Sequence, residues 1–397
     1  MAAIASTGAT PTLRPVSSIL TSAKAPSQSN RGRPSHYAVA MSVANDKRRL
    51  AVAINPSNLI LTYDVMTAVD NGPVSISRGP KLTRHVQFSP VDDHILGVAG
   101  QGGISLIDTR VPVDYSKMDF NGTILCRDDA HCVAFGCGGT LLCGGFEDGV
   151  IRFWDARSSN PLGVFRESHV DSVLTMQFHP RDPTKLISAS ADGTANLYEI
   201  SAKNEEEALL MTWHPACDMV QSFFYVDRVR NVEMIGLISS THRVSLWSVD
   251  EGNCVGAFQI QSLSLPVTLD YVVHVIYDER HDVFVIVAGK FGNHALFRLT
   301  LGASFEVDPS GAILDLGTLV RFDCELSDGH YALVRGAVYP EEGNTDRFLT
   351  YGEDAKICAW DVRQPGPEPG GVGKRKTIAG SGGQGGGEKG HFVKRRS

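Results

Sequence analysis

The chain has 397 residues, of which 42% are hydrophobic and 20% charged, a globular balance that excludes a wholly disordered protein. Forty glycines, about a tenth of the chain, imply many tight turns and argue against a helical bundle. No apolar run approaches the roughly 18 residues of a membrane span, and eight cysteines are too few for a disulfide scaffold. We therefore expect reduced thiols, a location in the nucleus or the cytoplasm, and no contact with a membrane.

The net charge of −7 is unevenly distributed along the chain. Residues 1–45 carry four basic and no acidic residues, and residues 364–397 carry seven basic and two acidic ones. Residues 46–363 therefore hold 26 basic and 42 acidic residues, a net charge of −16. An acidic body argues against a nucleic-acid platform and favours a Lys/Arg-rich protein partner. The basic tails remain a secondary candidate for contact with RNA.

Residues 1–34 are rich in Ala, Ser, Thr and Pro and are predicted to be a mostly disordered tail. Their acid-poor, Ser-rich composition is shared with organellar transit peptides. However, the arginines are sparse and no clear amphipathic helix is present, so we do not favour an organellar location.

Residues 35–363 contain an internal repeat. Seven units end in a large apolar or aromatic residue: Tyr63-Asp64, Ile107-Asp108, Trp154-Asp155, Tyr198-Glu199, Trp247-Ser248, Phe297-Arg298 and Trp360-Asp361. Successive endpoints lie about 44–50 residues apart, except for a last gap of about 63. This period, with a terminal Trp-Asp and an upstream Gly-His, is typical of WD repeats. The sequence therefore predicts an all-β, seven-bladed WD-repeat propeller with disordered N- and C-terminal tails.

Local patterns within the repeat agree with strands. Residues 186–198 form a strand, an Asp-Gly turn and a second strand. Residues 283–287 are continuously apolar, as expected for a strand buried on both faces. Residues 203–210 could form one or two helical turns between blades.

A buried hydrogen-bond chain is expected in two units, because each combines His, a hydroxyl residue, Asp and an aromatic residue. In the last unit these residues are His330, Thr350, Asp354 and Trp360. In the fourth they are His169, Ser188, Asp192 and Tyr198. Within each set, every buried polar side chain has a hydrogen-bond partner in a neighbouring member of the set. We interpret both sets as structural tetrads that only superficially resemble a hydrolase triad, and we expect no catalytic residue and no enzyme activity.

Closure of the ring requires an outer strand for the last blade. The Gly/Pro-rich segment 364–397 begins directly after the last unit and is predicted to be a basic disordered tail. Its clusters 374–376 and 394–396 form a weak nuclear-localisation signal. The closing strand must therefore come from the N-terminal side, where Thr12 to Thr21 is the best candidate.

The other candidate chemical motifs favour structural roles. Four cysteines gather in the third unit (Cys126, Cys132, Cys137 and Cys143), but no Cys-x-x-Cys pair is present, so packing is favoured over a zinc site. The glycine-rich residues 136–139 lie between two strands and are predicted to form a hairpin turn, without a helix to hold phosphate. We expect no metal and no cofactor.

Particular stretches resemble the WD repeat-containing protein 89 family. They are residues 169–180, 188–193, 204–209, 269–271, 281–282, 288–290 and 352–360, with the basic C-terminus. The resemblance covers roughly residues 40–363, and its most specific part is the acidic run after the fourth endpoint. It implies a propeller with a scaffold role and no established reaction.

Two surface motifs suggest how such a scaffold binds. Arg157 and Arg363 end Trp-Asp-x-Arg sequences, and Arg110 ends a degenerate third copy. This pattern resembles the box of propellers that serve as substrate receptors of cullin-4 ubiquitin ligases through their damage-binding adaptor. The alternative is that each arginine only pairs with a nearby carboxylate.

The second motif is the run Glu205, Glu206 and Glu207, which concentrates negative charge after the fourth endpoint. We predict that it helps to bind a Lys/Arg-rich segment of a protein in nuclear or ribosome-assembly work.

Overall fold

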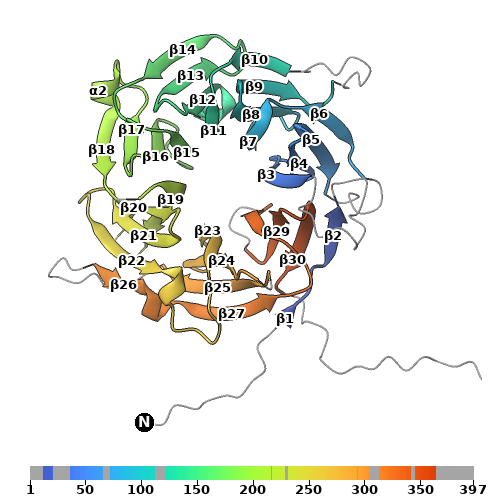
Figure 1. Ribbon diagram of the computed structural model, residues 1–397. Coiled ribbons are helices and arrows are strands. Elements are labelled where there is room, and N and C mark those ends of the chain that lie inside the picture. Colours follow the sequence, from blue (N-terminus) through green and yellow to red (C-terminus); the bar gives the residue numbers. More distant parts are fainter. Residues whose placement is uncertain are drawn as a thin grey trace, which may run out of the picture. The chain divides into compact units, whose positions relative to one another are not determined.

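A computed structural model describes residues 12–20, 36–65, 72–111, 122–215, 217–228, 231–292, 294–303, 313–340 and 345–363. Its strands form seven mainly antiparallel sheets arranged as blades around a ring (Figure 1). The prediction of a seven-bladed, all-β propeller is confirmed. The predictions of disorder for most of residues 1–34 and for residues 364–397 fall largely outside the described residues.

The first four blades each contain four consecutive strands, from the innermost to the outermost. Blade one holds β3 (Tyr37–Val43), β4 (Arg49–Asn55), β5 (Leu59–Asp64) and β6 (Ser75–Arg78). Blade two holds β7 (Lys81–Phe88), β8 (Ile95–Gln101), β9 (Gly103–Asp108) and β10 (Gly122–Cys126). Blade three holds β11 (Ala130–Gly136), β12 (Leu141–Phe146), β13 (Ile151–Asp155) and β14 (Pro161–Phe165). Blade four holds β15 (Val173–Phe178), β16 (Lys185–Ser190), β17 (Ala195–Glu199) and β18 (Leu209–Trp213).

The remaining three blades depart from this simple order. Blade five holds β19 (Met219–Asp227), β20 (Val232–Ser239), β21 (Arg243–Ser248), β22 (Cys254–Gln259) and β26 (Leu314–Asp315). Blade six holds β23 (Tyr271–Asp278), β24 (Val283–Gly289), β25 (Leu296–Gly302), β27 (Arg321–Leu326) and β1 (Thr12–Leu13). Blade seven holds β28 (Val334–Val338), β29 (Arg347–Gly352), β30 (Lys356–Asp361) and β2 (Ser17–Leu20).

The hydrophobic core lies between neighbouring blades. The second strands β4, β16 and β24 are buried almost throughout, because each is covered by a blade on either side. One cluster, for example, joins Ala53 and Ile60 of blade one to Val86 and Val98 of blade two. The continuous apolar runs in the sequence therefore correspond to strands between two packed layers.

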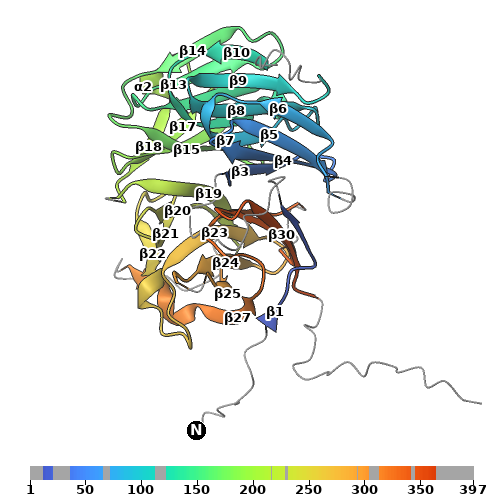
Figure 2. The same ribbon diagram turned by 45° about the vertical axis from the view of Figure 1, so that its right-hand side comes forward.

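The N-terminal segment closes the ring. Strand β2 pairs antiparallel with β30, with Ser17 opposite Ala359 and Leu20 opposite Lys356. Strand β1 pairs with β27 of blade six, so the segment spans two blades (Figure 2). Leu13 is buried in the cluster that contains Trp360. The closing strand therefore lies on the N-terminal side of the chain, within the predicted range Thr12 to Thr21.

Two local predictions can be compared directly with the structure. Residues Cys137–Gly139 form a single 3-10 turn, η1, between β11 and β12, as expected for a hairpin connection. The helix α2 (Glu205–Ala208) exists, but it lies between β17 and β18, inside blade four. The prediction that this segment connects two blades was wrong, because β18 follows the helix and completes the blade.

Candidate functional site

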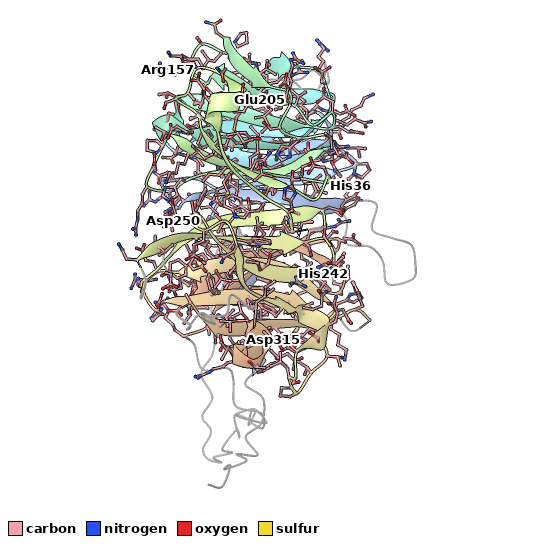
Figure 3. The ribbon with its side chains drawn as sticks, turned by 90° about the vertical axis from the view of Figure 1, so that its left-hand side faces the viewer. His36, Arg157, Glu205, His242, Asp250 and Asp315 are labelled. Atoms are coloured by element: carbon pink, nitrogen blue, oxygen red, sulfur yellow. The ribbon has the colours of Figure 1, made fainter. Side chains whose placement is uncertain are left out.

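The ring has two faces, which we name after residues labelled in Figure 3. The Arg157 face carries the turns between the first and second strands and between the third and fourth strands of each blade. The His242 face carries the turns between the second and third strands and the links from one blade to the next. Arg157 and Asp250 lie at one edge of the ring in Figure 3, and His36 and His242 lie at the opposite edge.

The predicted tetrad of blade seven is a continuous hydrogen-bond chain. The Nδ1 atom of His330 lies 3.0 Å from Asp354 Oδ1, and its Nε2 atom lies 2.8 Å from Thr350 Oγ1. The indole N–H of Trp360 donates to the same Thr350 hydroxyl at 2.8 Å. The side chains of His330 and Asp354 are completely buried. The chain therefore ties the link that enters the blade to its second and third strands.

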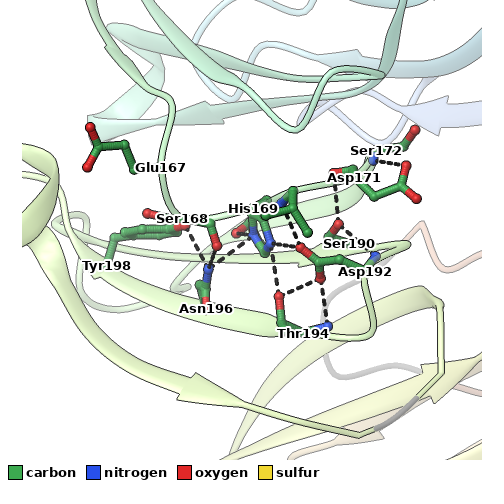
Figure 4. A network of polar contacts seen from close by, with 12 residues as sticks. Glu167, Ser168, His169, Asp171, Ser172, Ser190, Asp192, Thr194, Asn196 and Tyr198 are labelled. Carbon is green, nitrogen blue, oxygen red and sulfur yellow. Dashed lines mark hydrogen bonds and ion pairs between the residues drawn. The ribbon is translucent and has the colours of Figure 1, made fainter.

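Blade four forms a modified version of this chain (Figure 4). His169 lies 2.7 Å from the Ser188 hydroxyl through Nε2 and 3.2 Å from Asp192 Oδ2 through Nδ1. Tyr198 stands in the position of tryptophan, and its hydroxyl oxygen accepts a hydrogen bond from Asn196 at 3.1 Å. Burial is the main cause that lowers the pKa of His169, so its imidazole is neutral near pH 7.

Sequence reasoning missed two side chains of this network, those of Asn196 and Thr194. Asn196 donates to the carbonyl of Ser168 at 2.9 Å. The Thr194 hydroxyl donates to Asp192 Oδ1 at 2.6 Å. Burial alone would raise the pKa of Asp192, but hydrogen bonds from Thr194 and from the Val170 N–H lower it. The available signal was the Asp-Gly-Thr turn, in which a carboxylate and a hydroxyl two residues apart bond to each other.

The repeat of blade three carries no such chain. His131 faces Arg84 of blade two, with Nε2 3.2 Å from the guanidinium. Gly144 stands where blades four and seven have a hydroxyl residue. A Cβ at Gly144 would lie 1.8 Å from Ile104 Cδ1, so a side chain at this position would displace Ile104 of blade two. A histidine in the link that enters a blade therefore does not predict a tetrad unless the second strand also carries a hydroxyl residue.

The acidic run does not form one exposed binding surface. The carboxylate of Glu205 turns inward and accepts the backbone N–H groups of Arg166, Glu167 and Ser168 at 2.6, 2.9 and 2.8 Å. It also accepts the Ser168 hydroxyl at 2.5 Å. In Figure 3 Glu205 lies on the rim of the ring, between the two faces. Glu205 holds a link in place, and only its neighbours remain as candidate partner-binding groups.

Those neighbours differ from each other as well. Glu207 and Asn204 bond reciprocally, since the Glu207 N–H donates to Asn204 Oδ1 at 2.8 Å and the Asn204 amide donates to Glu207 at 3.1 Å. This is a cap at the start of α2. Glu206 is exposed, and no residue in the described part of the chain pairs with its carboxylate.

The arginines of the three Trp-Asp-x-Arg-like sequences all follow third strands, so they share the Arg157 face. The Arg157 side chain is 74% exposed, against 53% for Arg110 and 50% for Arg363. The guanidinium groups of Arg110 and Arg363 both donate hydrogen bonds through Nε and Nη2 to the aspartate two residues earlier. Arg157 lies 3.5 Å from Asp155. Arg157 is thus the most available of the three guanidinium groups.

Arg157 also borders a groove of about 450 Å³ between blades two and three. Its lining includes the apolar side chains of Leu106 and Phe135 and the carboxylate of Asp92. At the mouth, Val91 is 68% exposed. A protein partner reaching this groove would meet an apolar floor and one guanidinium at its edge.

Carboxylates converge on the His242 face at blades three and four. Asp129, Glu147 and Asp171 come from three successive connections and all act electrostatically on His131. The backbone joins them, since the Glu147 N–H donates to the Asp129 carbonyl at 3.0 Å. Burial lowers the pKa of His131 and Arg84 lowers it further, while the three carboxylates work in the opposite direction. The imidazole is therefore neutral near pH 7 and does not offset these charges.

Among the described residues, no group of three or more His, Cys, Asp or Glu side chains is arranged to hold an ion. Cys132 and Cys143 are buried, and burial raises the pKa of both thiols. None of the helices among the described residues has the length and hydropathy to cross a membrane.

Comparisons with known proteins agree with this architecture. The family model for the WD domain, G-beta repeat matches residues 120–155 and 159–199. The WD repeat-containing protein GTS1 of Arabidopsis thaliana is 26% identical over 286 residues, or 68% of this chain and 67% of that protein. The WD repeat-containing protein 89 homolog of Dictyostelium discoideum is 21% identical over 325 residues, or 78% of this chain and 79% of that protein.

A shorter match is to eukaryotic translation initiation factor 3 subunit I of Debaryomyces hansenii. It is 26% identical over 137 residues, which cover 30% of this chain and 39% of that protein. None of these matches indicates an enzyme family, and propellers of this kind generally serve as protein-interaction scaffolds. The repeat, the seven blades and the similarity over most of the chain show a WD-repeat β-propeller that resembles the WD repeat-containing protein 89 homolog.

Proposed function

We propose that this chain is a non-catalytic scaffold that holds a Lys/Arg-rich protein segment on the His242 face, over blades three and four. The observation that carries the proposal is that hydrogen bonds hold together the connections bearing Asp129, Glu147 and Asp171. The Glu147 N–H donates to the Asp129 carbonyl at 3.0 Å, and the hydroxyl of Ser172, next to Asp171, donates to the Glu147 carbonyl at 3.1 Å. The carboxylate of Glu147 is 56% exposed, and Asp148 and Asp171 are also exposed. Cationic side chains would be attracted to this cluster, mainly through a faster association.

Neighbouring arginines only partly compensate this charge. Arg84 lies 3.5 Å from Glu147, and Arg152 pairs with Asp128. The described turns 127–129, 147–149 and 166–172 and these two arginines together contribute six carboxylates and four guanidinium groups. A net negative charge remains on exposed groups, and a Lys/Arg-rich segment would complement it.

The test measures binding of a fluorescent Lys/Arg-rich peptide to the full-length chain. Replacing Glu147, Asp148 and Asp171 by their amides keeps the size of each side chain and removes three charges. We expect about a tenfold weaker affinity and a smaller dependence on salt. Glu206→Gln is the matched control, because it removes one exposed charge from the rim. Equal binding by the triple variant and the unmodified chain would refute the proposal.

A second candidate rests on the exposure of Arg157 beside the groove between blades two and three. A planar guanidinium in this position can form bidentate contacts with an adaptor of a cullin-4 type ligase. Arg157→Ala should then abolish co-purification with the adaptor and leave the Lys/Arg-rich peptide bound as before. If Arg157→Ala and Arg363→Ala both retain the adaptor, this candidate is wrong.

The place of action is a further part of the proposal. The basic clusters 374–376 and 394–396 support a nuclear location. The partial similarity to a translation initiation factor subunit supports work connected with ribosomes. Microscopy of the full-length chain, with and without lysines and arginines at the two clusters, tests the location.

A further inference from the structure

The blades differ in whether a fifth strand covers their outer edge. In blade five β26 adds in parallel to β22, and in blade six β1 adds in parallel to β27. Each of these additions is a short fifth strand supplied by a distant part of the same chain. By contrast, β14 ends the sheet of blade three, and no described strand pairs with its outer edge. The fold therefore contains two examples of strand addition and an edge at which the same addition remains open.

The open edge of β14 is unusually apolar. Leu162 is 61% exposed and Val164 is 37% exposed, and they lie two residues apart on one side of the strand. A Cβ built on Gly163 would have no atom within 4 Å. Natural edge strands are usually protected by charges, prolines or a covering segment. Only Pro161, at the first position, protects this strand, which leaves residues 162–165 able to pair.

A groove runs beside this edge, between blades two and three on the rim. It has a volume of about 480 Å³, and the side chains of Leu125 and Trp154 contribute to its lining. Strands β10 and β14 border it and lie side by side on the outside of the ring (Figure 1). Ile124 of β10, 41% exposed, extends the apolar surface. An extended segment on β14 would therefore bury side chains on both blades.

The charged residues that line the groove are all positive. Arg152 and Arg166 line it, and no carboxylate does so among the described residues. Arg152 is already paired with Asp128. The guanidinium of Arg166 is exposed and has no carboxylate partner in the part of the chain that the structure describes. An acidic side chain on an incoming segment would pair with Arg166.

We propose that β14 accepts an extended segment of a partner protein as a fifth strand of blade three. The segment carries aliphatic residues at alternate positions, which pack on Leu162 and Val164, and an acidic residue that meets Arg166. Main-chain hydrogen bonds to the free edge provide the affinity, and the alternating side chains provide the selectivity. This site is on the rim, and its lining includes neither the carboxylates of Glu147, Asp148 and Asp171 nor the guanidinium of Arg157.

The experiment selects displayed random peptides on the full-length chain and sequences those that bind. Enriched peptides should carry aliphatic residues at alternate positions and an acidic residue. Their affinity should fall about tenfold with Leu162→Asp and several-fold with Arg166→Gln. The matched controls are Leu319→Asp, at a 47% exposed leucine elsewhere on the ring, and Arg157→Gln. Neither control should alter binding.

Hydrogen exchange identifies the binding mode. A bound peptide should slow amide exchange in residues 162–165 and leave β6, the outer strand of blade one, unchanged. Peptides that bind equally well to Leu162→Asp, or that protect no amide of β14, would overturn the proposal. A chain that dimerises, and becomes monomeric with Leu162→Asp, would show that the occupant is a second copy and would also overturn it. Each of these results is independent of the Lys/Arg-rich peptide and of the ligase adaptor.

Discussion

Glu205 provides the sharpest test of the difference between a structural and a partner-binding acid. Its two carboxylate oxygens accept four hydrogen bonds from the link between blades three and four. In Glu205→Gln one oxygen becomes an NH₂ group that cannot accept a hydrogen bond. If Oε2 is replaced, the Arg166 N–H loses its acceptor and the three bonds to Oε1 become neutral.

The expected cost follows from these bonds. A hydrogen bond to a charged group contributes about 1.5–3 kcal/mol and one between neutral groups about 0.5–1.5 kcal/mol. Arg166 and Glu167 are exposed, so water replaces part of what is lost. We therefore expect Glu205→Gln to lower the free energy of unfolding by about 1–3 kcal/mol. With an unfolding entropy of about 2.1 cal/mol/K per residue, this corresponds to a thermal midpoint about 1–4 °C lower for a chain of this size.

The cost should also depend on pH. Burial works to raise the pKa of Glu205, but the bonds from Ser168, Arg166 and Glu167 lower it below the ordinary 4.5. A carboxylate with a lowered pKa stabilises the fold above its unfolded pKa and loses this contribution as the pH falls. The difference between the unmodified chain and Glu205→Gln should be complete at pH 7 and should shrink below about pH 4.5.

Thermal and chemical unfolding of Glu205→Gln, Glu206→Gln and the unmodified chain make the comparison. The two variants carry the same chemical change on adjacent residues of α2. Glu206→Gln should alter stability by less than about 0.5 kcal/mol, because its side chain is exposed. Equal destabilisation by both variants, or none by Glu205→Gln, would refute the assignment of Glu205 to the link.

Three further substitutions or deletions test the fold. Trp360→Ala should cost about 3–5 kcal/mol, because the side chain is only 2% exposed, and an unfolding measurement below about 1 kcal/mol would contradict the tetrad. Tyr198→Phe should cost about 1–2 kcal/mol by removing the acceptor of Asn196, and an unchanged unfolding midpoint would contradict that role. Deletion of residues 1–34 removes β1 and β2 and exposes the edges of two blades, so light scattering should detect oligomers or aggregates; a stable monomer would contradict closure by β2.

The architecture could be predicted from the sequence because its evidence is local and repeated. Each unit carries its own endpoint, such as Trp154-Asp155 or Trp360-Asp361, and the spacing repeats along the chain. The closing strand could be predicted by elimination, since prolines after residue 363 cannot donate ladder hydrogen bonds. The fifth strands β1 and β26 could not be predicted, because two residues carry no periodic pattern and their pairing depends on distant segments.

The acidic run shows where charge counting fails. Three consecutive glutamates look equivalent in the sequence, but Asn204 begins the helix and thereby fixes the direction of each side chain. Glu205 consequently points to the neighbouring link, whereas Glu207 completes the cap. The pattern of Asn followed three residues later by Glu was available as a capping signal. Read in this way, the run would have been assigned to local structure before it was assigned to a partner.

The arginines of the Trp-Asp-x-Arg sequences also look equivalent in the sequence but differ in the structure. In blade seven the carboxylate of Asp361 accepts hydrogen bonds from Arg363 and Arg347, and these bonds lower the pKa of Asp361 to about 2. In blade three Asp155 accepts the backbone N–H groups of Arg157 and Ser158, at 2.8 and 3.1 Å. Its carboxylate is thereby engaged by the turn, and the guanidinium of Arg157 stays largely exposed. The Trp-Asp-x-Arg motif therefore gives a surface ion pair in blade seven and an exposed guanidinium in blade three. The difference depends on which neighbouring groups bind the aspartate.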